Sequence, residues 1–550
     1  MSDGGMTAKS RYDRLESDRL TFLDRARRCA EITIPTLIPP QAHSKSTIYY
    51  TPWQGIGARG VNNLASKLLL SLLPPNSPFF RLDVDDFTIK AMTGDPTQRA
   101  IVEEGLNKIE RAVQSEIEGT GLRSPTFLAL KNLIVGGNYL TYLPKEGGMK
   151  GYRLDSYVVK RDVLGDVLEI IAKDEVSPAS LPKDVRMMLD DDHDDDYAKG
   201  HKDAGEAENE TEYDDALEDY TNSCQLFTHM YRAGDKWRLY QEIKGKRIPG
   251  SEGTYPLDKC PMIVMRWSVV DNEDYGRSYV EEYLGDLVSL EGLSKAIVQA
   301  AAAAAKTVFL LNPNGVTRLN DVVKAESGDV IIGVKTDIDS VQTDKQADMR
   351  IAYEASKTIT DRLSMAFMLN TSVQRQAERV TAEEIKFVAT ELEDALGGVY
   401  TILSQEFQLP LVRRLMDRMT KAKRLPALPT GIVKPVIVTG VEALGRGQDL
   451  GKLNALVQAL APLGPDVLKQ YLNPGDYIKR VATSLSLDFQ GLVKSDEQIQ
   501  QEMQQEQQAQ QQQQMMQMAG SAIPNATKAI GDQALAAQQS QSAPPGPPGS

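Results

Sequence analysis

The sequence predicts an α+β fold that is mainly helical and is divided into several domains. Its 550 residues are enough for about three or four domains. Apolar residues recur at helical spacing along most of the chain, most regularly after residue 278. Strand-like segments gather within residues 152–243, and no regular alternation of strands and helices surrounds them. This combination favours separate helical and sheet-containing regions over a parallel α/β fold.

Four helices are expected before the first strands, over residues 11–31, 61–73, 99–118 and 124–136. The second of them, VNNLASKLLLSLL, is strongly apolar and ends at Pro74-Pro75. The others have an amphipathic pattern. In the first helix, the apolar face is expected to contain Tyr12, Leu15, Leu20, Leu23 and Ala26.

Two pairs of strands are expected next. The first pair lies within 152–176 and flanks a turn at Asp162–Asp166. The second pair, Leu226–Tyr231 and Trp237–Ile243, flanks Ala233-Gly234-Asp235. These turns contain the glycine and aspartate residues that tight connections between strands favour.

Residues 184–222, between the two pairs, are acidic, poor in apolar side chains and without periodicity. Such a segment buries too little surface to offset its ordering entropy, so disorder is expected. Binding of a hard cation through Asp190–Asp196 is the alternative, although the spacing matches no calcium loop.

The same segment dominates the net charge. Residues 190–220 contain 15 Asp and Glu against Lys199 and Lys202, a balance of −13, and the whole chain carries −14. The remainder is near −1, since −14 minus −13 is −1. The acidic total therefore does not exclude a nucleic acid as a partner of the folded part.

Long helices dominate from residue 278 onward. The first, 278–306, ends in six alanines, Ala300–Ala305, and Asn312–Gly315 follows as a break. A second helix is expected over 345–369 and a polar interval over 370–380.

A third long helix is expected to begin at the capping-box sequence Thr381-Ala382-Glu383-Glu384 and to be kinked at Pro410. Shorter helices are expected over 442–485. The Gln-rich chain beyond Ser495 cannot form a core, and its end is expected to be flexible.

One pattern suggests a nucleotide site. Gly55, Gly57 and Gly60 form G-x-G-x-x-G at the start of a helix, and Asp83 lies where a dinucleotide fold would place its ribose-binding acid. However, the preceding stretch contains Pro52 and is not the apolar run of a buried parallel strand. A tight turn that lets a helix pack closely is therefore favoured over an enzyme site.

Other signatures of enzymes and of membrane or secreted proteins are missing from the sequence. Neither Gly-Lys pair is followed by Ser or Thr, no G-x-S-x-G occurs, and the four histidines lack metal-ligand spacing. No catalytic residue, cofactor or metal is therefore expected. The N-terminus is too charged for a signal peptide, and 296–311 is too short and polar to span a bilayer. Cys29, Cys224 and Cys260 are odd in number and far apart, which fits a reducing cytoplasm.

Five long segments carry a resemblance. They are TPWQGIGARGVNNLASKLLLSLLPP (51–75), YRLDSYVVKRDVLGDVLEI (152–170), DYGRSYVEEYLGDLVSLE (274–291), AFMLNTSVQRQAERVTAEEI (366–385) and ELEDALGGVYTILSQEFQLPLV (391–412). In sequence, order and spacing they resemble the portal, or head-to-tail connector, proteins of short-tailed, podovirus-type bacteriophages. The resemblance covers about residues 10–490 and leaves the acidic segment and the Gln-rich tail without a counterpart.

The resemblance implies a portal fold assembled as a ring, normally a dodecamer, at one capsid vertex of the virion. The ring would form the DNA channel for viral genome packaging and ejection. The implied parts are an N-terminal wing (1–277), stem helix 1 (278–306), a clip (307–344), stem helix 2 (345–369), a channel loop (370–380), a long wing helix (381–430), a crown (431–490) and a flexible tail (491–550).

It also implies the partners. These are further copies of the chain, double-stranded DNA, the terminase large subunit, tail adaptor and tubular tail proteins, the major capsid and scaffolding proteins, and internal core proteins. No membrane is involved, and assembly would take place in the host cytoplasm. Any ATP would be hydrolysed by another chain.

Two sets of residues are candidates for the site. In the channel loop they are Arg375 and Arg379 with Gln374 and Gln376, because a few basic rings in a near-neutral channel can contact DNA without holding it tightly. The alternative is a solvated loop in which these arginines pair with Glu378 or Glu383. Ala300, Ala301, Ala302, Ala303, Ala304 and Ala305 would permit close packing of the stem, although alanine is common in helices generally.

Two other functions remain possible at this stage. A structural scaffold or adaptor of the virion would share the ring symmetry without a lumen wide enough for DNA. A nucleotide-dependent oxidoreductase would use Gly55–Gly60. An image along the ring axis distinguishes a ring with a central hole, a ring or rod without one, and a compact globule.

Overall fold

The computed structural model describes residues 7–44, 46–75, 79–84, 96–182, 185–186, 223–304, 308–341, 346–369, 382–426 and 433–437, with scattered positions between 455 and 513. The chain divides into two units, Met1–Ala443 and Leu444–Ser550. In the second unit, residues 455–460 are helical. The acidic segment 184–222 apart from residues 185–186, most of 442–485 and the end of the tail lie outside the described residues. The fold below is that of the first unit.

Helix α1 (Ala8–Ile32) begins at Thr7, whose hydroxyl accepts a hydrogen bond from the Ser10 amide at 3.1 Å. The expected face is buried at Tyr12, Leu15, Leu23 and Ala26. The prediction for Leu20 is wrong, because its side chain is 45% exposed. Leu20 follows Leu15 by five residues, which turns it well away from that face.

The N-terminal end of α1 is fixed to a sheet by buried charges. The Ala8 amide donates to the Glu242 carboxylate at 2.8 Å, and the Arg11 guanidinium donates to both oxygens of Glu169. His229 Nε2 lies 2.8 Å from Glu169 Oε1, and its Nδ1 lies 2.8 Å from the Tyr240 hydroxyl. These contacts attach the helix beside a small apolar cluster that includes Ala8, Tyr12 and Phe227.

The sheet beneath α1 is antiparallel, with strand order β4-β5-β6-β7-β8 and β9 pairing with β7. Both expected strand pairs are confirmed, with turns at Gly165 and Gly234, where φ is +88° and +61°. Val176 pairs with Cys224, so the chain leaves and re-enters the sheet at one point on either side of the acidic segment. The strands are β4 (Tyr157–Arg161), β5 (Val167–Val176), β6 (Cys224–Ala233), β7 (Lys236–Ile243), β8 (Lys246–Arg247) and β9 (Gly253–Pro256).

The main core lies among helices α2 (Ile56–Leu72) and α5 (Arg123–Gly136) and a second sheet of order β10-β2-β3. The strands of this sheet, β2 (Asn138–Tyr142), β3 (Lys150–Tyr152) and β10 (Met262–Arg266), were not expected from the sequence. Helix α4 (Pro96–Gly119) packs beside β1 (Phe80–Val84). Short 3₁₀ turns lie at Leu154–Ser156, Pro178–Ser180, Leu257–Lys259 and Lys335–Asp337.

Strand β13 (Val433–Ile437) pairs antiparallel with β1, Phe80 opposite Ile437. The start of the range expected as the crown, 431–490, therefore belongs to the first unit. Long-range strand pairing of this kind leaves no local sign in the sequence.

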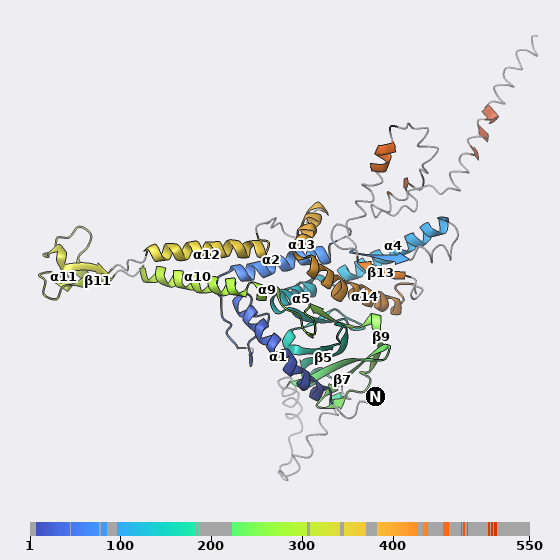
Figure 1. Ribbon diagram of the computed structural model, residues 1–550, viewed down its shortest axis with the longest axis horizontal. Helices are drawn as coiled ribbons and strands as arrows, with labels where there is room; N and C mark the ends of the chain where they lie inside the picture. The colour runs from blue at the N-terminus through green and yellow to red at the C-terminus, as the bar shows by residue number, and fades with distance from the viewer. Residues whose placement is uncertain are drawn as a thin grey trace, which may run out of the picture. The chain divides into compact units, whose positions relative to one another are not determined.

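The expected helix 278–306 is interrupted. It starts as α9 (Tyr279–Glu282), breaks at Tyr283 and continues as α10 (Leu284–Ala304). The expected helix 345–369 is α12 (Gln346–Ala366), which lies alongside α10 (Figure 1). Between them in sequence, β11 (Val308–Leu311) pairs with β12 (Ile338–Val341), and α11 (Leu319–Lys324) lies in the connection.

The third long helix is α13 (Ala382–Leu403), followed by a π-helical turn at Ser404–Gln408, labelled η6, and by α14 (Leu409–Lys421). The irregular turn directly precedes Pro410, which has no amide hydrogen for a helical bond to residue 406. A kink was expected at Pro410, and the regular α-helix is interrupted just before this residue. A second deviation, at Leu396 (φ −130°), was not expected, and the capping residue Thr381 lies outside the described part of the chain.

Candidate functional site: the helix pair and its attachment

The helix pair, α10 with α12, has a narrow buried seam. Leu287, Leu290 and Leu363 are buried in it, and Arg362 forms an ion pair with Asp286 at 2.7 Å. Most other side chains of the two helices are exposed or half-buried. The pair therefore presents a large surface that the described part of the chain leaves uncovered.

Several exposed side chains of the helix pair are apolar, namely Val288, Val298, Ile351, Tyr353 and Met365. Of the six predicted alanines, Ala300 is half-buried and Ala301, Ala302 and Ala303 are exposed, while Ala305 and the side chain of Ala304 lie outside what the structure describes. The alanines do not form a packed seam within one chain. Any close packing through Ala301–Ala303 requires another molecule.

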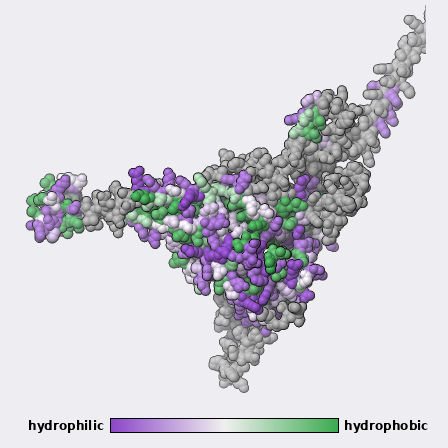
Figure 2. Space-filling view, in the orientation of Figure 1, coloured by the Kyte–Doolittle hydropathy of each residue, from purple (hydrophilic) through white to green (hydrophobic). Residues whose placement is uncertain are grey.

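The segment that contains β11, α11 and β12 has even less of a core. Asp337 links two parts of this segment. Its carboxylate accepts hydrogen bonds from the Val316 amide and from the Thr317 amide and hydroxyl. The Thr317 bonds lower the pKa of Asp337. The exposed apolar side chains are Leu310, Val316, Leu319, Val323, Val330, Ile331, Ile332 and Val334. Figure 2 shows hydrophobic patches on this segment beside hydrophilic ones.

The loop before α9 attaches the helix pair to the body. Its sequence, DYGRS (274–278), belongs to one of the five segments singled out above. The Asp274 carboxylate accepts from the Arg161 amide and the Lys160 ammonium, both at 2.7 Å, and the buried Tyr275 hydroxyl accepts from the Val159 amide.

The second half of the DYGRS loop is fixed as closely. A Cβ on Gly276 would lie 2.6 Å from the Ser268 carbonyl oxygen, so only glycine fits. Arg277 binds both oxygens of Glu273, and the Ser278 hydroxyl caps α9 by accepting from the Glu281 amide. Asp274 and Tyr275 therefore attach the loop to β4, and Arg277 and Ser278 fix the loop and the start of α9.

An aromatic cluster lies where both helices of the pair meet the body. The Tyr279 ring lies between those of Trp267, Tyr283 and Phe367, with centroids 5.1–5.7 Å apart. A Cβ on Gly60 would lie 2.5 Å from Phe367 Cγ. The third glycine of the G-x-G-x-x-G pattern therefore allows α2 to approach this cluster, as the close-packing interpretation predicted.

The turn that leads into α2, where a dinucleotide fold would bind pyrophosphate, is bound by this chain's own carboxylate, and the Gly57 amide in the first turn donates to the Gln54 side chain at 2.9 Å. Glu291 of α10 accepts from the amides of Trp53 at 2.9 Å and Gln54 at 3.2 Å, and from the Tyr50 hydroxyl. Asp83 lies in β1, and every strand pair in the described part of the chain is antiparallel. The oxidoreductase hypothesis is therefore wrong.

A buried charge cluster joins the third long helix to both sheets. Glu406, in the π-helical turn, accepts two hydrogen bonds from the Arg266 guanidinium at 2.9 and 2.6 Å and lies 3.6 Å from Arg161. Desolvation by burial lowers the pKa of Arg161. Two buried guanidinium groups thus share one carboxylate, and sequence analysis missed all three residues.

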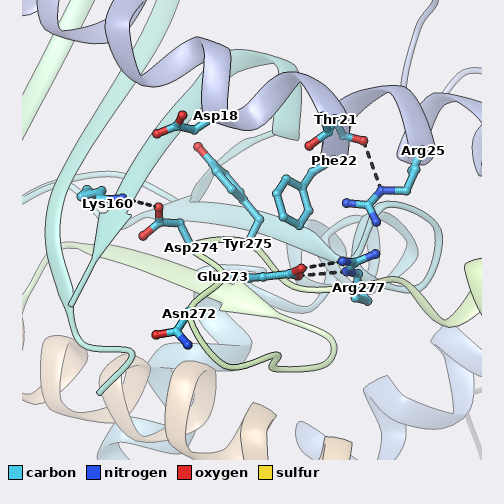
Figure 3. A pocket seen from close by; sticks show the side chains of 10 residues that line it. All are labelled: Asp18, Thr21, Phe22, Arg25, Lys160, Asn272, Glu273, Asp274, Tyr275 and Arg277. Atoms are coloured by element: carbon cyan, nitrogen blue, oxygen red, sulfur yellow. Dashed lines mark hydrogen bonds and ion pairs between the residues drawn. The ribbon is translucent and has the colours of Figure 1, made fainter. Parts of the chain in front are cut away.

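A shallow pocket lies between α1, β4 and the loop at 272–277 (Figure 3). Its charged groups neutralise one another, with Lys160 on Asp274 and Arg277 on Glu273. The Arg25 guanidinium lies 4.7 Å from the centroid of the Phe22 ring. None of the residues that line the pocket is a histidine or cysteine.

The predicted channel-loop residues Arg375, Arg379, Gln374 and Gln376 lie outside the described residues. The structure describes both flanking helices, α12 and α13. Among residues with described positions, no group of three or more His, Cys, Asp or Glu could hold a metal ion. In the same part of the chain, none of the helices has the length and apolar character needed to cross a membrane.

Comparison with known proteins gives consistent matches. The family model described as "Bacteriophage head to tail connecting protein" matches residues 6–493. The chain is 44% identical over 503 residues to the portal protein of Escherichia phage T7 and 45% identical over 503 residues to that of Enterobacteria phage T3, with 90% of each chain covered. It is 32% identical over 505 residues to the portal protein of Enterobacteria phage SP6, covering 91% of this chain and 92% of that one.

Proposed function

The chain belongs to the family of bacteriophage head-to-tail connecting proteins, and from this premise we propose that its α10–α12 pair is the stem of a twelve-membered ring around DNA. The family membership itself establishes a portal protein, a structural connector at the capsid vertex and not an enzyme. The number of subunits, the parts of the ring and the residues in the channel are the proposal.

The exposed surface of the helix pair carries this proposal. The alanines at 301–303 and Val298 lie uncovered on α10, and Ile351 and Tyr353 lie uncovered on α12. Apolar surface of this kind on a soluble chain marks an interaction site. When two neighbouring copies of a chain meet through different surfaces, the contact is heterologous. Repeating this contact produces a ring when the successive rotations return to the first copy.

The remaining parts follow the same assignment. Residues 1–277 are proposed as wing, 307–344 as clip, 381–430 as the long wing helix and 431–490 as crown. Strand β13, at the start of the proposed crown, pairs with β1 of the proposed wing. The weak core of residues 308–341 supports the clip, because such a segment needs neighbours to cover its apolar side chains. Terminase, tail adaptor and tubular tail proteins are proposed to bind there. Capsid, scaffolding and internal core proteins are proposed to contact the wing and crown.

Residues 370–380 are proposed as the channel loop, with Arg375 and Arg379 facing DNA beside Gln374 and Gln376. Their place between α12 and α13 supports this, since both flanking helices extend from the region where the stem meets the body. Arginine stays protonated and forms paired hydrogen bonds with phosphate oxygens. In a ring, each arginine becomes a circle of like charges.

Imaging of the purified full-length chain tests the ring. We expect negative-stain images along the axis to show a ring with a central hole, formed without DNA, nucleotide or metal. A monodisperse monomer in light scattering at micromolar concentration and near-physiological salt would contradict it. A ring without a lumen would favour the scaffold or adaptor function instead.

The double variant R375A/R379A tests the channel loop. We expect it to assemble normally, because none of the contacts described above is made by these two residues, and to package or retain less DNA. Full genomes at the normal level in the double-variant heads would show that the constriction is formed by other residues.

A further inference from the structure

The C-terminal end of α12 has an unusual backbone. Met368 adopts φ +52°, in the left-handed region that favours glycine, and the Leu369 amide donates to the Ser364 carbonyl at 2.8 Å. This is a Schellman-type helix end with a side chain at the position that glycine usually occupies. A non-glycine residue there is held against a conformational cost by its surroundings.

Helix α2 provides that support. The Asn63 side-chain amide donates to the carbonyl oxygens of both Phe367 and Met368 at 3.0 Å. The Lys67 ammonium donates to the Met368 carbonyl at 3.2 Å. Lys67 is only 8% exposed, and a cation at the C-terminal end of a helix also interacts favourably with the helix dipole.

The same lysine contacts the next helix. The Lys67 ammonium lies 2.9 Å from Glu391 Oε2 of α13. One turn further along α2, the Ser71 hydroxyl donates to the Tyr400 hydroxyl, which itself donates to the Ser71 carbonyl, both at 2.9 Å. Asn63, Lys67 and Ser71 are spaced by four residues, so they form one polar stripe on α2 that faces α12 and then α13.

We propose that Lys67 is a positioning residue that sets the location of α12 relative to α13. It thereby sets the distance between the end of α12 and the start of α13, which residues 370–381 connect. An ammonium group has three donors, and Lys67 places them on acceptors from both helices at once. Its burial makes this arrangement demanding, because a buried ammonium must remain paired. The proposal rests on the proposed function of residues 370–380 as the channel loop.

Four variants of the full-length chain separate this role from general stability. K67M keeps the length of the side chain and removes the charge, whereas K67R keeps the charge and the donors. E391Q weakens the contact with α13 alone. R59A, an exposed position on the same helix, serves as the matched control.

Hydrogen–deuterium exchange of the purified assembly gives the first readout. In K67M we expect amide exchange to rise about tenfold both near residues 363–369 and in α13. A tenfold change corresponds to the middle of the range of coupling free energies measured between residues that share a hydrogen-bond network. K67R should restore protection, E391Q should affect α13 more than α12, and R59A should affect neither. A rise at one flank only, or at neither, would overturn the proposal. If K67M fails to assemble, the exchange of K67R and E391Q tests the proposal instead. Normal protection in K67R with faster exchange in α13 of E391Q supports it, and unchanged exchange in E391Q contradicts it.

DNA retention in assembled heads gives the second readout. We expect K67M heads to lose packaged DNA as R375A/R379A heads do, and K67R heads to retain it. If R375A/R379A loses DNA while K67M retains it, the positioning role in the channel is wrong and the proposed function stands. If both retain DNA while exchange rises at both flanks, the channel-loop assignment fails and the link between α12 and α13 stands.

Discussion

The body of the molecule buries its apolar side chains, whereas the helix pair exposes many of its own. In the body, apolar side chains from α1, α2, α5 and the two sheets are buried in one continuous core with small satellites. On the helix pair and on residues 308–341, side chains such as Val330 (98% exposed) and Ile332 (82% exposed) remain uncovered. The body therefore buries its apolar side chains through its own contacts, whereas the helix pair and the 308–341 segment leave many of theirs exposed in the single chain.

Ion pairs show the same contrast. Arg266–Glu406 and Arg362–Asp286 have nearly equal separations, 2.6 and 2.7 Å. The first pair is buried, with side chains 6% and 16% exposed, and the second is open, at 60% and 31%. Equal distances therefore do not mean equal energies, because removing one partner of a buried pair leaves an unpaired charge in the interior.

The largest effect is expected from breaking the buried pair. E406A leaves the guanidinium groups of Arg161 and Arg266 without their shared carboxylate and should lower the free energy of unfolding by about 3–5 kcal/mol. R362A, its counterpart on the helix pair, should cost no more than about 1 kcal/mol. Urea denaturation followed by tryptophan fluorescence measures both. Equal losses would mean that the two regions do not differ in the way described.

The next effect concerns the alanines of the helix pair. A302W adds a large side chain at a position that is exposed in the single chain, so the urea midpoint of the body should not change. If a neighbouring subunit packs there, each contact should lose about 1–3 kcal/mol through overpacking and the ring should dissociate. Sizing chromatography with light scattering tests this, with A302S as the matched control. Intact A302W rings would place the subunit contact elsewhere.

A third comparison lies at the junction of the two regions. G60A forces a methyl group against the Phe367 ring and should destabilise the body by about 1–3 kcal/mol. G55A, in the same motif, meets no atom within 4 Å and should change stability by no more than about 0.5 kcal/mol. Thermal unfolding of the two variants measures the difference. A larger loss in G55A would argue that the motif is not a packing motif.

The last effect depends on pH and is confined to the body. Desolvation raises the pKa of Glu169, but hydrogen bonds from His229 and Arg11 outweigh it and lower this pKa from 4.5 to about 2. A depressed carboxyl pKa stabilises the folded state above about pH 4.5, and this stabilisation disappears as the pH falls towards 2. The gap in melting temperature between wild type and E169Q should therefore be wider at pH 6 than at pH 3. A gap independent of pH would exclude this origin.

Local patterns in the sequence were sufficient for much of the secondary structure. The spacing of apolar residues located α1, α2, α4, α5, α12 and the paired strands β4–β5 and β6–β7, because helices and hairpins form from residues close together in the chain. The glycine motif was interpreted correctly as a packing feature, since Pro52 and the absence of a preceding apolar strand argue against a dinucleotide fold. Long idiosyncratic segments were enough to indicate the family.

Contacts between distant residues could not be inferred in this way. Glu291 at the N-terminus of α2, Glu406 between two arginines, and Lys67 between α12 and α13 all look like ordinary charged residues in helical sequence. Strands β2, β3 and β10 follow or precede stronger local patterns, and the pairing of β2 with β10 joins residues at least 120 positions apart, as with Tyr142 and Met262. A charge becomes a structural element only when the folded chain removes water from it and supplies a partner, and the tertiary structure alone determines where that occurs.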